Sequence, residues 1–274
     1  PLKVQLPLHI GQLHWAGPPA LDITGLQGDY VFDGKHHNLN LAPFDIAQGR
    51  YTAQARLQAA APMALEVQLH GQVQTAASPR TRSLTLDADG SVEGSLSGPD
   101  AALTVAVHIS PAGAAATGMQ LDLMASLRPW QSQPVQNATG HWQQLDLASL
   151  WPGAPHTRLK GQGTVSPDAT GWQLATQLRN AEPGPWNSDR LPLSQLDARL
   201  AYQQGLWQVQ QLDAAMANGR VKGQGEQTAS GWTGVLDLSG LQPAQLHSAL
   251  SGTPLQGQIR AHTTENNAIA IKAD

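Results

Sequence analysis

The chain has no cysteine, only two phenylalanines and three tyrosines, and few charges: Lys, Arg, Asp and Glu make up 13% of 274 residues, about half the usual share. The missing cysteines exclude disulfides, thiolate metal sites and a cysteine nucleophile, and are compatible with a bacterial periplasm. The net charge of -4 and the lack of a Lys/Arg cluster argue against a nucleic-acid partner, because phosphate is bound by basic surfaces.

No apolar run is long enough to span a membrane, and no signal peptide opens the chain. Strand-like sequence starts directly after Pro1, with apolar residues at every second position. We therefore expect the chain to be an excised, internal piece of a longer protein, whose targeting or anchoring segments lie outside it.

Alternation with period two dominates the sequence. Leu65, Val67 and Leu69 are separated by Glu66 and Gln68, and several other segments repeat the pattern. Alternation of this kind is typical of strands with one apolar and one wet face. Short clusters rich in Gly, Pro and Asp lie between the strands, which predicts antiparallel hairpins or meanders. These expected turns include residues 87–90, 97–100 and 111–113.

Two stretches depart from this pattern. Residues 144–152 place Leu147, Leu150 and Trp151 at helical spacing before a proline. Residues 241–252 have an early proline, leucines four positions apart and a terminal glycine. Both predict helices of one or two turns between groups of strands.

One phrase occurs twice, at residues 30–57 and 202–226. Both copies predict strand, tight turn, strand, turn, strand, as in an array whose repeats bury their apolar faces by stacking on neighbours. The shared positions are Tyr30/Tyr202, Gly34/Gly205, Leu41/Leu212, Ala47/Ala217, Gly49/Gly219 and Arg50/Arg220. We expect the leucines on the apolar face and both arginines in water.

No convincing linker interrupts the chain. We therefore predict one continuous β-array over residues 1–274, with approximate units 1–140, 141–230 and 231–274. Among the tryptophans, Trp172, Trp207 and Trp232 are expected on the apolar face, and Trp186, in a Pro-Gly loop, is expected to be exposed.

Candidate metal sites are weak. His36 and His37 are adjacent on a predicted strand and point to opposite faces, so they cannot easily chelate one ion; we expect both to be solvated. Asp87, Asp89 and Glu93 faintly resemble a calcium loop, but the EF-hand spacing is missing, and a hairpin turn is the better interpretation.

Catalytic candidates are equally weak. Asp22, Asp29, Asp33 and Asp45 could supply a glycosidase carboxylate pair, although turn-like surroundings favour solvated loop residues. No Gly-x-Ser-x-Gly elbow of a serine hydrolase occurs. We predict a protein that is not an enzyme, with no catalytic residue, metal or cofactor.

The order of motifs carries a family resemblance. A strand opening with Gly-Trp, a short Leu-Asp-Leu-x-x-Leu helix, an Asn-Gly-Arg turn and a Gly-x-Gly strand resemble the TamB family of AsmA-like, bridge-type lipid-transfer proteins of Gram-negative envelopes. The sister families YhdP, YdbH and AsmA share this architecture. The resembling segments are residues 145–163, 171–193, 196–225 and 231–257, with 26–57 as a more divergent copy.

The resemblance implies an all-β fold: an elongated, curled, mainly antiparallel sheet (a β-taco, or open groove) with an apolar interior and short inserted helices. It also implies a periplasmic location, a parent chain anchored in the inner membrane, and a TamA-type outer-membrane barrel as partner of the parent chain.

The function predicted on this basis is carriage of phospholipid acyl chains along the groove, with membrane contact only through the missing termini. A flexible tail suits a small aliphatic lining, and each buried methylene contributes about 0.8 kcal/mol. The predicted lining residues are Leu65, Val67, Leu69, Leu84, Leu86, Leu103, Val105, Val107, Ile109, Leu121, Leu123, Leu174, Leu178, Leu236, Leu238 and Ile259.

Three alternatives stay open. Alternation alone favours a closed β-sandwich or barrel core, because most half-apolar strands face a sealed core. A scaffold could assist assembly of outer-membrane proteins, such as autotransporters, by β-augmentation at an exposed edge. An enzyme or adhesin on a β-solenoid would need regular short coils, which the uneven strand lengths disfavour.

Overall fold

The structure, a computed structural model, describes residues 2–16, 20–77, 83–113, 118–229, 231–263 and 269–273. The chain divides into two compact units, Pro1–Ala138 and Thr139–Asp274.

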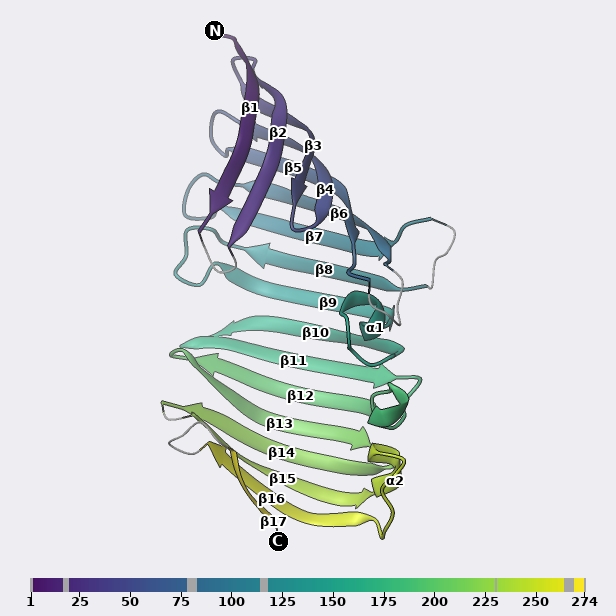
Figure 1. Ribbon diagram of the computed structural model, residues 1–274. Helices are drawn as coiled ribbons and strands as arrows, with labels where there is room; N and C mark the ends of the chain where they lie inside the picture. Colours follow the sequence, from purple (N-terminus) through teal and green to yellow (C-terminus); the bar gives the residue numbers. More distant parts are fainter. Residues whose placement is uncertain are drawn as a thin grey trace. The chain divides into compact units, whose positions relative to one another are not determined.

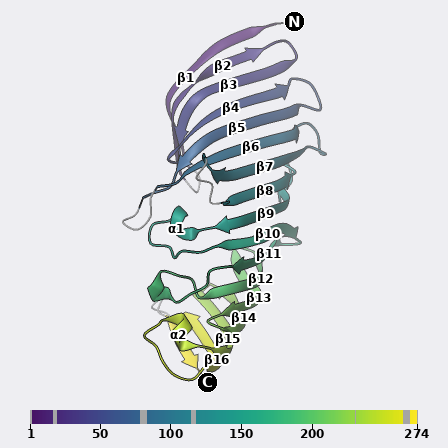
Figure 2. The same cartoon turned by 90° about the vertical axis from the view of Figure 1, so that its right-hand side faces the viewer.

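The first unit is an antiparallel sheet whose strands lie side by side in chain order (Figures 1 and 2). Short connections join consecutive strands, as the Gly- and Pro-rich clusters at residues 97–100 and 111–113 predict. The strands are β1 (Val4–Trp15), β2 (Leu21–Phe32), β3 (His36–Ile46), β4 (Gly49–Gln58), β5 (Ala64–Gln74), β6 (Thr85–Ser95), β7 (Ala102–Pro111) and β8 (Gln120–Leu127).

The second unit repeats this design. Its strands also pair antiparallel in chain order, and β9 pairs with β10. The strands are β9 (Val135–Leu145), most of which belongs to this unit, β10 (Leu159–Asp168), β11 (Gly171–Asn180), β12 (Leu193–Gln203), β13 (Leu206–Met216), β14 (Gly219–Thr228), β15 (Gly231–Leu241), β16 (Leu255–Thr263) and β17 (Ile269–Ala273).

Both predicted helices are present. They are α1 (Leu147–Leu150) and α2 (Pro243–Leu246), and a 3-10 turn, η1 (Trp186–Ser188), lies between them in sequence. Asp146 caps α1 by accepting a hydrogen bond from the backbone N–H of Ala148. Within the described ranges, no helix has the length and apolar character needed to cross a bilayer.

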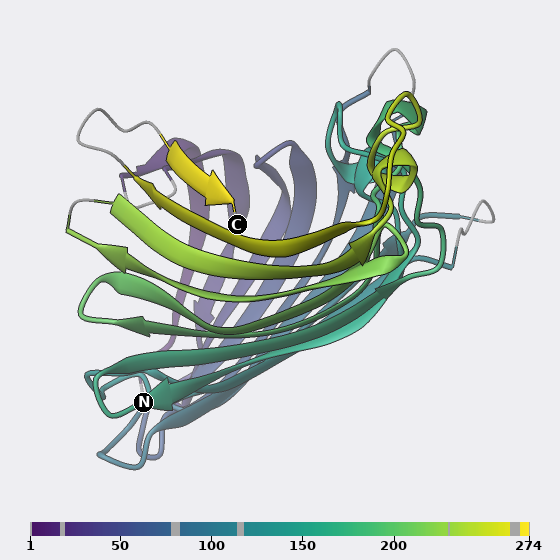
Figure 3. The ribbon, with the colours of Figure 1, turned by 90° about the horizontal axis from the view of Figure 1, so that it is seen from below.

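The predicted fold class is confirmed as all-β, antiparallel and open, with short inserted helices. The predicted curl is wrong: strands of the second unit bow along their length (Figure 3), but the sheet of each unit is open and uncurled. Among the described residues, β1 pairs only with β2 and β17 only with β16. Antiparallel pairing of this kind also excludes the parallel coils of a β-helix.

β14 and β15, on either side of the expected boundary at residue 230, pair from Arg220 opposite Ser239 to Thr228 opposite Gly231. The turn predicted at residues 87–90 is wrong, because β6 runs through it. Asp87 and Asp89 hydrogen-bond to Gln72 and His70 of the neighbouring strand, so acidic residues that are common in turns here occupy the wet face of a strand.

The repeated phrase forms the same structure twice, as β2–β3–β4 and β12–β13–β14. In each copy the second turn has two central residues at positive φ, with Ala47 at 49° and Ala217 at 47°. This is the type I′ geometry that matches the twist of a hairpin. Both arginines that follow are exposed, as predicted. Arg220 holds Asp213 through a two-pronged ion pair, 2.5 and 2.6 Å long, which lowers the pKa of Asp213.

Candidate functional site: one apolar face on each sheet

The apolar face of the first unit follows from strand register, because directly opposed residues on paired strands share a face. Val105 of β7 lies opposite Val92 of β6 and Ala125 of β8, and Val92 lies opposite Val67 of β5. From β4 to β8, the positions on this face include no Asp, Glu, Lys or Arg. The predicted residues brought together here are Leu65, Val67, Leu69, Leu86, Leu103, Val105, Val107, Ile109, Leu121 and Leu123.

The second unit has an equivalent face. Leu178 lies opposite Leu196, and Leu174 lies opposite Leu200. The pairing of the following strands extends the same face through β13 and β14 to β15. Here too, the positions from β11 to β15 carry no charged side chain. The predicted residues on this face are Leu174, Leu178, Leu236, Leu238 and Ile259. Leu84 lies just before β6, where its backbone hydrogen-bonds to Thr75.

Neither apolar face is covered by a second sheet. Among the described residues, strands in substantial contact are sequential neighbours, and the predicted lining residues, with Leu86 as the buried exception, are half-buried or exposed. The accessible surface is 16818 Å². Two separate compact domains, each with half of the chain's mass, would together expose about 14,000 Å². The alternative of a closed sandwich or barrel is therefore wrong for each unit.

The opposite faces are polar. In the first unit one row runs across five strands: Thr52, His70, Asp89, His108 and Asp122. Nδ1 of His70 lies 2.5 Å from Oδ1 of Asp89, and the corresponding atoms of His108 and Asp122 are 2.7 Å apart. The hydrogen bond to Asp89 raises the pKa of His70. Because both pairs are exposed, they contribute little to stability.

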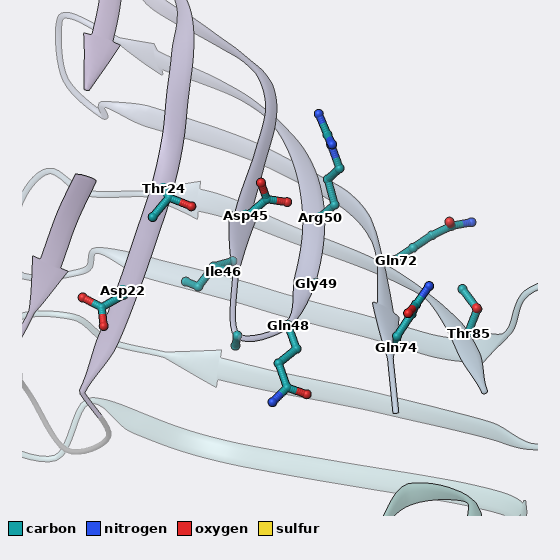
Figure 4. A pocket seen from close by; sticks show the side chains of 11 residues that line it. Asp22, Thr24, Asp45, Ile46, Gln48, Gly49, Arg50, Gln72, Gln74 and Thr85 are labelled. Atoms are coloured by element: carbon teal, nitrogen blue, oxygen red, sulfur yellow. The ribbon is translucent and has the colours of Figure 1, made fainter. Parts of the chain in front are cut away.

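Three hollows lie between polar side chains. One, of about 590 Å³, is bordered by Asp22, Thr24, Asp45, Arg50 and Gln72, among others (Figure 4). Two more, of about 450 and 650 Å³, lie over β10–β13 and β9–β12. Of the predicted lining residues, Leu178 alone borders one of these three hollows.

The carboxylates considered for sugar chemistry are only partly brought together. Asp22 and Asp45 border the same hollow, whereas Asp33 accepts hydrogen bonds from the backbone N–H groups of His36 and Lys35. These bonds lower the pKa of Asp33 to about 2, and a hydrogen bond to His14 lowers the pKa of Asp22. A glycosidase general acid needs the opposite shift.

The two adjacent histidines do point to opposite faces, as predicted. His36 lies beside Asp33 and Arg56. The expectation that both are solvated is wrong: His36 and His37 are both half-buried, and the ring of His37 stacks on Phe32 with centroids 4.7 Å apart. Within the described segments, no three His, Asp or Glu side chains are grouped to hold a metal ion.

Four aromatic side chains of the second unit lie in a row that the sequence did not predict. An aromatic row, defined here as Trp172, Tyr202, Trp207 and Trp232, crosses β11–β15 at one end of the apolar face. The three tryptophans were expected on this face individually. Their alignment follows from the pairing of neighbouring strands, which a sequence does not show. The one sequence feature that pointed to it is the Gly-Trp pair that follows a turn at both Gly171 and Gly231.

A comparison with protein families, curated proteins and solved structures finds no match to this chain. The resemblance to the TamB family is therefore a proposal, and the geometry of the two apolar faces is the observation to be explained.

Proposed function

We propose that this chain carries phospholipid acyl chains along its apolar faces, as a periplasmic bridge segment of a TamB-like protein between the inner and outer membranes. The observation behind the proposal is the uncovered, charge-free apolar face on each sheet. Soluble monomers rarely leave apolar patches larger than a few hundred Å² in water, so such faces favour an apolar occupant.

The physical chemistry of the faces suits a tail that slides. Leucine, valine and alanine offer contact without directional bonds, so each methylene exchanges one apolar neighbour for another as it moves. A charge on the face would have to lose its water before a tail could pass, at a cost of several kcal/mol. From β4 to β8 the face has no such obstacle.

The proposal predicts that affinity depends on tail length. In a displacement assay with a fluorescent fatty acid, phosphatidylcholines whose tails lengthen by two methylenes at a time should bind at least tenfold tighter per step. About 0.8 kcal/mol per buried methylene gives this factor. The gain should level off once the tail outgrows the face. An affinity that is flat across the series would contradict acyl burial.

A second candidate is a scaffold that assists assembly of outer-membrane proteins, such as autotransporters, by pairing with a free strand edge. The observation in its favour is β1, whose side chains Leu6, Leu13 and Trp15 are all exposed by 46% or more. Long apolar edge strands are templates for pairing with another chain. This activity would use the backbone of β1 and would not need the apolar face.

A further inference from the structure

The two ends of the strands in the second unit differ. At the turn end, tight connections join β10 to β11, β12 to β13 and β14 to β15. At the helix end, longer connections carry α1, η1 and α2, which gather at one end of the strands (Figure 3). The apolar face lies between a short-turn end and a helix-covered end.

The helix end is sealed. Leu246 of α2 packs against a buried cluster made of Ala214, Ala217, Val221 and Leu241. The connections that carry η1 and α2 are also joined by a hydrogen bond, because the backbone N–H of Ser248 donates to Oδ1 of Asn187 at 2.9 Å. Val221 and Leu241 are only 6% and 3% exposed, so an apolar ligand would meet packed protein here.

The turn end is open and aromatic. Trp172 lies opposite Tyr202, and Tyr202 opposite Trp207, whose ring centroid is 4.9 Å from that of Tyr202. Gln227 of β14 lies next in the row, and Trp232, which lies opposite Gln227, is 44% exposed. Tyr and Trp combine a large apolar body with a polar tip, and are enriched where hydrocarbon meets water.

The dimensions between these ends fit a lipid tail. From Trp172 to Leu178 along β11, six residues at about 3.3 Å each span roughly 20 Å. One leaflet of a bilayer's hydrocarbon core is about 15 Å thick. The polar groups at the turn end are amides and a carboxylate: Gln173 and Gln203 both donate to Asp168. Residues 168–173, 202–208 and 226–233 contain no Lys or Arg.

Resting on the proposed function, we propose that the aromatic row marks the headgroup end of the bound lipid. The tails lie along the strands and point to the helix end, and the headgroup sits in water beside Trp172, Tyr202, Trp207 and Trp232. Because the described residues of the three tight turns at this end include no Lys or Arg, the occupant is a phospholipid whose headgroup has no net charge, held by its tails.

Two photoreactive phosphatidylcholines test this orientation, one with a diazirine in the headgroup and one with a diazirine at the tail terminus. After illumination with the full chain, crosslinked peptides are mapped by mass spectrometry. The headgroup probe should label peptides of the turn end, around Trp172, Trp207 and Trp232. The tail probe should label the helix end, around Met216 and Leu246.

The outcomes separate the two proposals. Headgroup label at the helix end, or both probes spread equally over both ends, would overturn the orientation while acyl binding stands. Label confined to the polar face, or none at all, would overturn the proposed function itself. Trp207→Leu keeps an apolar side chain but removes the indole ring with its polar N–H; it should retain tail crosslinking at the helix end and at least halve the turn-end share of headgroup label. An unchanged headgroup pattern in W207L would contradict the role of the row.

Discussion

A chain with aspartate at both Val107 and Leu236 is expected to bind phospholipid at least tenfold more weakly than the unmodified chain. Val107 lies on the apolar face of the first unit and Leu236 on that of the second, so the pair places one carboxylate in each lipid path. A tail can pass only if the carboxylate loses water, and a penalty of about 1.4 kcal/mol already gives a tenfold loss. Fluorescent phospholipid binding measures the effect.

The matched control uses the preceding residue on each strand. Ala106 and Val235 lie on the polar faces, opposite Ser91 and Arg260, so aspartate at both should leave lipid binding within about twofold. The first double variant also separates the two candidate functions, because a scaffold that uses the edge of β1 would keep its activity with aspartate at Val107 and Leu236. Equal loss of lipid binding in both double variants would contradict a one-sided site.

Gly219→Ala is expected to destabilise the second unit by about 2 kcal/mol. A Cβ at Gly219 would lie 2.5 Å from the carbonyl carbon of Gly240 and from the backbone nitrogen of Leu241. Backbone of the paired strand cannot move aside as a flexible side chain can, and overpacking of this kind typically costs 1–3 kcal/mol. Urea unfolding followed by circular dichroism measures the change.

Gly163→Ala is the control for this substitution. Its Cβ would meet the ring of Trp142 at 3.6 Å, an ordinary van der Waals contact, so its unfolding midpoint should stay close to that of the unmodified chain. Equal destabilisation by the two substitutions would contradict the tight packing of β14 against β15 at the repeated turn.

Period-two alternation was sufficient to predict the strands and their faces where side chains are clearly apolar or polar. Leu103, Val105, Val107 and Ile109 share one face of β7 because successive side chains on a strand point to opposite sides. Both short helices were also recognisable, since Pro152 and Pro243 mark where strand pairing must stop or a helix can begin.

Other features depend on more than local pattern. Residues 87–90 have turn-like composition, yet Asp87 and Asp89 lie on the wet face of β6 opposite Gln72 and His70. His37 is half-buried because Phe32 lies directly opposite it on β2. Pairings between strands decide both positions, and a single sequence does not show register.

The candidate site likewise has a part that the sequence predicted and a part that it did not. Membership of the apolar face was predictable, because it follows from alternation within each strand. The aromatic row and the sealed helix end were not, because they arise when residues as distant as Trp172 and Trp232 align across five strands.

Site-specific photo-crosslinking along β7 tests the central claim most directly. A photoreactive amino acid is placed in turn at Thr104, Val105, Ala106 and Val107, and the chain is illuminated with phospholipid. The account predicts capture of phospholipid at Val105 and Val107 and none above background at Thr104 and Ala106, since these pairs lie on opposite faces. Equal capture at all four positions, or capture confined to Thr104 and Ala106, would contradict it.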